Sequence, residues 1–177
     1  MNRKFINWQM AGFVAAGLVG TLLHFLFDWT NGSAIVGAVS AVNESIWEHM
    51  KLLFWPLFLF AVVEYWFWGK RLAGFWWVKL WGILTGLAWI PVLYYTYTGA
   101  LGRSADWFNI AIFYLAAAWT FRWETSLLQK DRCWVVPGWA AFLALSLLAG
   151  LFVLWTFCPP RIPLFMDPQT GSYGYNR

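Results

Sequence analysis

Residues 8–29 read WQMAGFVAAGLVGTLLHFLFDW, an apolar run broken only by Gln9, His24 and Asp28. A helix of about 20 apolar residues is long enough to cross the roughly 30 Å hydrocarbon core of a bilayer. The preceding Arg3 and Lys4 give this region some likeness to a signal peptide. However, the run is longer than the usual apolar part of a signal peptide, and no A-x-A-like cleavage site follows it. We therefore predict that this run is a first transmembrane helix.

The composition of the whole chain agrees with that prediction. The chain has 177 residues, of which 61% are hydrophobic and 11% charged, and 16 are tryptophan. Soluble domains carry about 25% charged residues, and tryptophan is enriched where a membrane meets water. We expect one all-α membrane domain and no nucleic-acid partner.

Four further apolar segments are long enough to span a bilayer. The five predicted spans are Trp8–Trp29, Lys51–Trp68, Gly74–Thr98, Ala105–Leu127 and Trp134–Phe157. With the N-terminus inside, eight of the twelve Lys and Arg residues lie on the inner side and four on the outer side. The positive-inside rule therefore favours a cytoplasmic N-terminus and an extracytoplasmic C-terminus.

Two segments outside the spans lie on the predicted outer side. Residues 32–42 are small and apolar but too few to span a membrane, so they form either a re-entrant or interfacial segment or a simple loop. We assign residues 1–158 to the transmembrane domain and residues 159–177 to a Pro-rich extracytoplasmic tail. The apolar residues of this tail suggest that it folds back over the outer ends of the helices, although a flexible terminus is the alternative.

The densest polar segment is NESIWEHMK, residues 43–51. Asn43 is a good N-cap residue for a helix, and Ser45 with Glu48 offers a capping box as the alternative. On a helix that starts at Asn43, Glu44, Glu48 and Lys51 share one face. Capping and a Glu48–Lys51 ion pair would explain these residues without any binding site.

His24 and Asp28 lie one helical turn apart near the outer end of the first span. Ionisable residues inside a membrane are costly and often functional, although a structural His24–Asp28 hydrogen bond is the simpler alternative. Two histidines with carboxylates suit a divalent transition metal, Zn²⁺ above all. The predicted metal ligands are His24, Asp28, Glu48 and His49.

Three functions remain open at this stage. The first is an outer pocket that binds a lipid headgroup or a small polar ligand, with Lys51 and Arg103 available for an anionic group. The second is a metal-dependent hydrolase that acts on a lipid-linked substrate at the outer leaflet, with Glu44 as general base. The candidate catalytic residues are Glu44, Glu48 and His49, and the candidate ligand-binding residues are Asp28, Asn43, Ser45, Trp47, Lys51, Arg103, Arg161 and Asp167.

The third function is a subunit that packs against another membrane protein. Gly12, Ala16 and Gly20 form a small-residue stripe on the first span, and such stripes let helices approach closely. The same stripe serves packing within the chain equally well. On the inner side we expect a structural ion pair between Glu64 and Arg122, and Lys79 is explained by lipid headgroups.

The segment VNESIWEHMK, residues 42–51, and the tail segment PPRIPLF, residues 159–165, resemble a family of small bacterial multi-pass membrane proteins of unknown function. The resemblance implies a bacterial cytoplasmic membrane and carries no activity. The alkaline ceramidase and adiponectin-receptor superfamily is a weaker comparison, since it also has histidine and aspartate ligands at one membrane face. This chain departs from that pattern in having five predicted spans, two histidines and no H-x-x-x-H motif.

Overall fold

The computed structural model describes residues 3–72, 74–130 and 137–175. Its helices are α1 (Arg3–Trp29), α2 (Ala34–Gly37), α3 (Ile46–Phe67), α4 (Phe75–Leu101), α5 (Asp106–Leu128) and α6 (Gly138–Phe157), with short 3₁₀ turns η1 (Gly69–Arg71) and η2 (Pro163–Phe165). Among the described residues, β pairing is limited to one isolated bridge between Met166 and Tyr173. The chain is therefore all-helical, as predicted.

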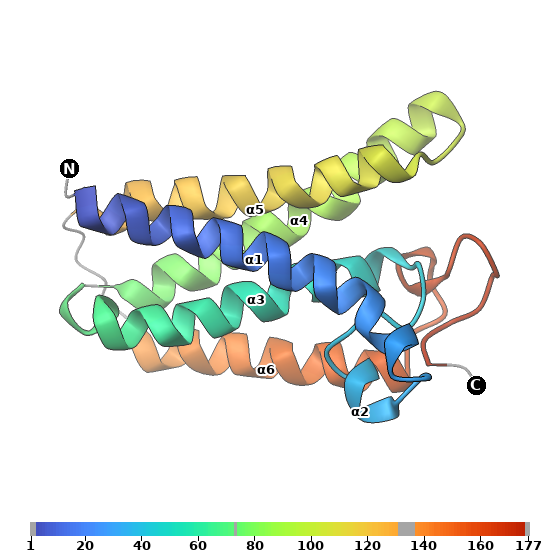
Figure 1. Cartoon of the computed structure of the whole chain (residues 1–177), viewed down its shortest axis with the longest axis horizontal. Coiled ribbons are helices and arrows are strands. Elements are labelled where there is room, and N and C mark those ends of the chain that lie inside the picture. Colours follow the sequence, from blue (N-terminus) through green and yellow to red (C-terminus); the bar gives the residue numbers. More distant parts are fainter. Residues whose placement is uncertain (1–2, 73, 131–136, 176–177) are drawn as a thin grey trace.

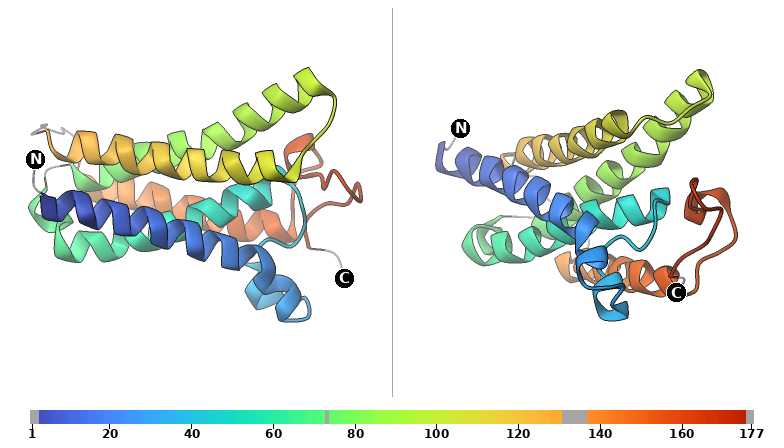
Figure 2. Two further views of the ribbon diagram at one scale, coloured as in Figure 1. Left: turned by 45° about the horizontal axis from the view of Figure 1, so that its top comes forward. Right: turned by 45° about the vertical axis from the view of Figure 1, so that its right-hand side comes forward.

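The five long helices run side by side as one bundle (Figure 1). Helix α3 packs against α1, α4, α5 and α6, and α4 also packs against α5 and α6. We call the end of the bundle that carries the start of α1 the Lys79 end, and the opposite end, with α2 and the tail, the His24 end. Toward the His24 end, α4 and the start of α5 lean away from the other helices (Figure 2).

The outer surface of the bundle is apolar. Large hydrophobic side chains are widely exposed along the helices, among them Leu18, Leu22, Leu115, Leu147 and Leu154. Exposed apolar areas of this extent are rare on soluble monomers, whereas a lipid bilayer covers them at no cost. The chain has the surface of a membrane protein.

Four of the five long helices are long and apolar enough to cross a bilayer: α1, α3, α4 and α6. Helix α5 is of similar length but more polar, because it carries Asp106, Asn109, Arg122 and Glu124. The start of the fifth predicted span, at Trp134, lies outside the described residues, and the helix there is described from Gly138. The structure thus supports four spans, and α5 is the fifth member of the bundle.

The small-residue stripe of α1 faces inward. A Cβ atom at Gly12 would lie 2.4 Å from the ring of Phe60, and one at Gly20 would lie 2.9 Å from the carbonyl oxygen of Leu52. Pro56 has no N–H, so it cannot donate the usual intrahelical hydrogen bond to the Leu52 carbonyl. Gly20 therefore lets α1 approach α3 where that carbonyl is free, and the stripe is used within the chain.

The ion pairs at the Lys79 end differ from two of our predictions. The Glu64 carboxylate pairs with Lys79, whose Nζ lies 2.5 Å from Oε2, and Lys79 also pairs with Glu124 at 2.5 Å. Arg122 is exposed instead. The predicted Glu64–Arg122 pair is wrong, and Lys79 is not a headgroup contact, because its side chain is buried between the helices.

Candidate functional site

The polar segment before α3 is not helical, and this decides where its side chains lie. Ser45 is the N-cap of α3: its backbone is extended, and its hydroxyl accepts a hydrogen bond from the Glu48 amide. Asn43 lies further upstream, where its side-chain oxygen accepts from the Ser45 amide at 2.9 Å. The prediction of a shared helix face and a Glu48–Lys51 ion pair is therefore confirmed for Glu48 and Lys51. It is wrong for Glu44, which precedes the helix.

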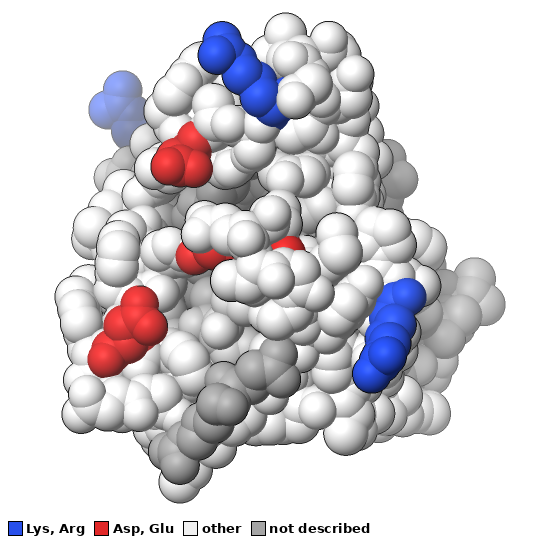
Figure 3. Space-filling model, turned by 90° about the vertical axis from the view of Figure 1, so that its right-hand side faces the viewer, with Lys and Arg blue, Asp and Glu red and all other residues white. Residues whose placement is uncertain are grey.

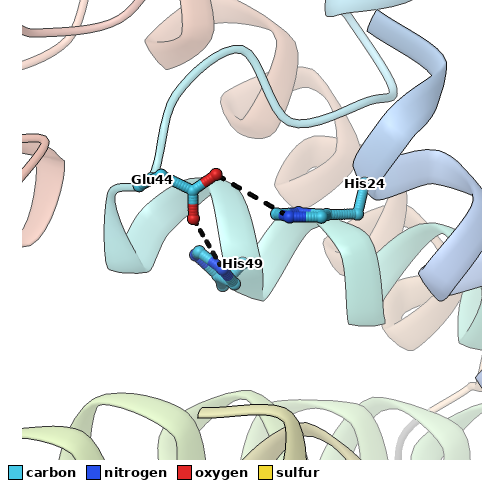
Figure 4. A group of neighbouring side chains, drawn as sticks. All are labelled: His24, Glu44 and His49. Atoms are coloured by element: carbon cyan, nitrogen blue, oxygen red, sulfur yellow. Dashed lines mark ion pairs between the residues drawn. The ribbon is translucent and has the colours of Figure 1, made fainter. Parts of the chain in front are cut away.

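Glu44 instead lies between the two histidines of the chain (Figure 4). One carboxylate oxygen is 3.7 Å from Nε2 of His24 on α1, and the other is 3.5 Å from Nε2 of His49 on α3. The three side chains are partly buried, and one ligand atom from each lies within 4.8 Å of the others. We call these three residues the His24 group.

The spacing of the His24 group suits a shared cation. A direct charge-assisted N–H···O bond would bring nitrogen and oxygen to about 2.7–2.9 Å. With metal–ligand bonds of about 2.0–2.1 Å, two ligands of a tetrahedral Zn²⁺ lie about 3.3 Å apart. The observed separations of 3.5 and 3.7 Å run to different Glu44 oxygens and are too long for direct hydrogen bonds. One ligand atom from each residue lies within 4.8 Å of the others, so the three side chains can converge on one ion.

The backbone around His49 sets the tautomer of its ring. Nδ1 lies 2.9 Å from the carbonyl oxygen of Ser45, which can only accept a hydrogen bond, so Nδ1 carries a proton. In the neutral ring Nε2 then presents its lone pair toward Glu44. A backbone carbonyl that orients a histidine in this way is the common outer partner of a metal ligand.

A cavity of about 260 Å³ adjoins the His24 group. Glu44, His49 and Ile46 form part of its wall, and residues of α4, of the first two turns of α5 with the preceding Ser104, and of the tail form the rest. Its polar lining comes from Glu44, His49, Tyr94, Ser104, Asp106, Asn109 and Gln169, and its apolar lining from Ile46, Ile90, Ile112, Phe113 and Pro168. The cavity therefore offers both hydrogen-bonding groups and an apolar wall beside the candidate metal ligands.

A hydrogen-bond network fixes the wall that α4 and α5 provide. The Tyr97 hydroxyl donates to the Asn109 side-chain oxygen at 2.5 Å and lies 3.0 Å from the Ser104 hydroxyl. The Asn109 amide also donates to Ser104 at 3.0 Å. Seen from the His24 end, acidic side chains lie on two sides of a hollow in the surface, and basic side chains lie toward the periphery of this face (Figure 3).

Glu48 and Lys51 lie apart from the His24 group, in a buried pair. Lys51 Nζ is 2.5 Å from Glu48, and it donates to the Gly37 carbonyl at 2.7 Å and the Thr156 hydroxyl at 2.8 Å. Glu48 also accepts from the Val42 amide and the Thr156 hydroxyl, both at 3.1 Å. This pair ties the loop after α2 to the end of α6.

The tail is folded against the His24 end. The ring of Phe165 packs on Trp47, with ring centroids 4.8 Å apart, and Asn43 donates to the Gly174 carbonyl at 3.1 Å. Asp167 is buried and accepts from the Gln169 amide and the Thr170 hydroxyl, so it shapes the turn of the tail. Trp47 and Asp167 thus hold the tail in place.

The remaining predicted residues lie outside the His24 group. Asp28, Arg103 and Arg161 are exposed, and Arg103 lies at a separate shallow depression with Trp107. The sequence analysis missed Tyr94 and Asn109 as cavity residues. Tyr94 lies on α4 and Asn109 on α5, and one polar residue within a long helix gives no distinct signal.

A family model matches the chain over residues 1–175. The chain belongs to the family of unknown function DUF6512. The match covers both the segment before α3 and the tail, the two regions that carried the resemblance seen in the sequence. Membership brings no activity with it, and neither the curated proteins nor the solved structures contain a match to this chain.

Proposed function

We propose that this membrane protein holds one divalent transition metal ion, Zn²⁺ above all, between His24, Glu44 and His49. The single observation that carries the proposal is the spacing of 3.5 and 3.7 Å between the histidine Nε2 atoms and the Glu44 oxygens. Two histidines and one glutamate are also a known ligand set of zinc, with a fourth position open to water or to a ligand. Glu44 replaces Asp28 and Glu48, the carboxylates that we predicted as metal ligands from the sequence.

The role proposed for the metal is to bind the headgroup of a lipid or a small polar ligand in the adjoining cavity. The cavity of about 260 Å³ borders Glu44 and His49, so a ligand in it reaches the open position of the ion. Asn109 and Tyr94 offer hydrogen bonds, and Ile90 and Phe113 offer apolar contact. With the predicted orientation, this site faces the outer leaflet of a bacterial cytoplasmic membrane.

A second candidate is a metal-dependent hydrolase that acts on a lipid-linked substrate. The observation that favours it is a second carboxylate in the cavity: Asp106 lines the same cavity as Glu44 and is not one of the three converging groups. A metal lowers the pKa of bound water to about 7 and so generates hydroxide. Asp106 would accept the water proton, and the hydroxide would add to the ester carbonyl carbon. The C–O bond to the leaving group would then break, and the leaving alkoxide would take the proton from Asp106 and depart as the alcohol.

Elemental analysis of the purified protein in detergent tests the metal site. We expect about one Zn²⁺, Mn²⁺ or Fe ion per chain in the wild type and a loss of that metal in His24→Ala, His49→Ala and Glu44→Gln. Asp28→Asn is the matched control, because Asp28 is acidic and near the His24 end but exposed and outside the group. A folded wild type that stays empty after metal is added back would refute the proposal.

Lipid mass spectrometry then separates the two candidates. Metal-loaded protein is incubated with vesicles of phosphatidylglycerol and phosphatidylethanolamine, and the lipids are analysed before and after. Unchanged lipid that co-purifies with wild type and not with His49→Ala supports binding. Cleaved headgroups that appear with wild type and not with Asp106→Asn support hydrolysis.

A further inference from the structure

A second polar centre lies inside the bundle, toward the Lys79 end. Gln9, Glu64, Lys79 and Glu124 come from α1, α3, α4 and α5 and are each at most 3% exposed. We call these four residues the Lys79 cluster. Glu64 lies 15 residues after His49 on α3. At a rise of about 1.5 Å per residue, the Lys79 cluster lies about 22 Å from the His24 group along the helix axis.

The charges of the Lys79 cluster do not balance. One ammonium group faces two carboxylates, each 2.5 Å from Lys79 Nζ, so the fully ionised cluster carries one net negative charge. The charges that act on Lys79 and on Glu124 come from the other members of the cluster. The Glu48–Lys51 pair, by contrast, balances one to one. A net charge buried between membrane helices is strongly unfavourable.

The hydrogen bonds of the cluster also leave one buried acceptor without a donor. The Gln9 amide nitrogen donates to Glu64 Oε1, in a short contact. The other atom of that amide, Gln9 Oε1, is buried and has no hydrogen-bond partner among the described residues. A carbonyl oxygen can only accept, and buried acceptors are nearly always satisfied. One O–H group in the cluster would supply the donor.

We infer that the Lys79 cluster is a proton-binding site that holds one proton between Glu64 and Glu124. The proton makes the cluster neutral, and the protonated carboxyl supplies an O–H donor within the cluster. Glu124 is held directly against α4, since a Cβ atom at Gly82 would lie 2.5 Å from its carboxyl oxygen. Uptake or release of this proton therefore changes the charge at the point where four helices meet.

Infrared spectroscopy of the purified protein at neutral pH tests the inference. Protonated carboxyl groups have a C=O stretching band of their own, and [¹³C]glutamate labelling distinguishes glutamic from aspartic acid. We expect one glutamic acid per chain in the wild type. Glu64→Gln and Glu124→Gln should each remove the whole band, because the remaining carboxylate then balances Lys79 and needs no proton. Lys79→Met should double the band, because both carboxyls then become neutral.

Asp28→Asn is the matched control and should leave the band unchanged, since it alters an exposed carboxylate outside the cluster. No glutamic acid band in the wild type would overturn the inference and would favour a bound cation in place of the proton. A band that survives in both glutamine variants would overturn it as well. If the variants do not fold, the labelled wild type decides alone, since any value other than one per chain contradicts the inference.

Discussion

Gly20→Ala is the substitution whose effect can best be worked out from the structure. The added methyl carbon would lie 2.9 Å from the Leu52 carbonyl oxygen and 2.5 Å from the ring of Phe113, whereas ordinary contacts begin at 3.4 Å. The ring can turn aside, but the carbonyl is backbone. Helix α1 must therefore move from α3 by about half an ångström, the difference between 3.4 and 2.9 Å. Overpacking of this kind costs about 1–3 kcal/mol.

Gly150→Ala on α6 is the matched control, because a Cβ atom there meets nothing within 4 Å among the described residues. Both variants gain the same helix propensity of about 1 kcal/mol. The difference between them is therefore the packing cost alone, and we expect Gly20→Ala to be less stable than Gly150→Ala by about 1–3 kcal/mol. Reversible unfolding in mixed detergent micelles, followed by circular dichroism, measures this difference.

The same shift should weaken the metal site. His24 lies four residues beyond Gly20 on α1, so it moves with the helix, and its Nε2 atom is already 3.7 Å from Glu44. Changes that disturb the orientation of metal ligands cost about 10–100-fold in affinity. We expect about a tenfold weaker Zn²⁺ affinity for Gly20→Ala in competition with a chromophoric chelator. Equal stability and equal affinity in the two alanine variants would refute the close packing of α1 on α3.

Three further predictions concern the His24 end. Thr156→Val removes the hydroxyl that hydrogen-bonds both Lys51 and Glu48 of the buried ion pair. We expect a loss of about 1–3 kcal/mol in the unfolding assay, and no comparable loss for Ser146→Ala, which removes a partly buried hydroxyl far from any ion pair in the described residues. Phe165→Ala removes the ring that packs on Trp47, so we expect a loss of about 3–5 kcal/mol and faster proteolysis within residues 159–175. Chelation of the metal should lower stability by about 2.7 kcal/mol relative to protein at a zinc concentration of 100 times Kd. The same treatment should have no effect on His49→Ala.

Most of the fold could be predicted from the sequence because apolar length is a strong signal. The predicted spans Gly74–Thr98 and Ala105–Leu127 differ from α4 and α5 by at most three residues at either end. The start of α3 was less predictable. Both Asn43 and Ser45 are good caps, and the choice between them depends on the tail, which bonds Asn43 to Gly174. A contact across 131 residues leaves no trace in a local pattern.

The site was predicted less well for the same reason. A shift of two residues in the helix start places Glu44 outside the helix and near His24, whereas Glu48 and Lys51 keep the predicted ion pair. The histidines and the acidic segment were therefore identified, but not the carboxylate that joins them. The Lys79 cluster was missed because its members come from four helices, and each alone is typical of the interfacial ends of membrane spans.

The tail completes the cavity wall, and it is synthesised after the residues of the His24 group. Pro168 and Gln169 line the cavity and follow all five long helices in the chain. A ribosome therefore produces these two residues after His24, Glu44 and His49. The three converging side chains can therefore meet an ion before the cavity has its final wall. An ion bound at this stage would be enclosed only when residues 159–175 pack against the helices.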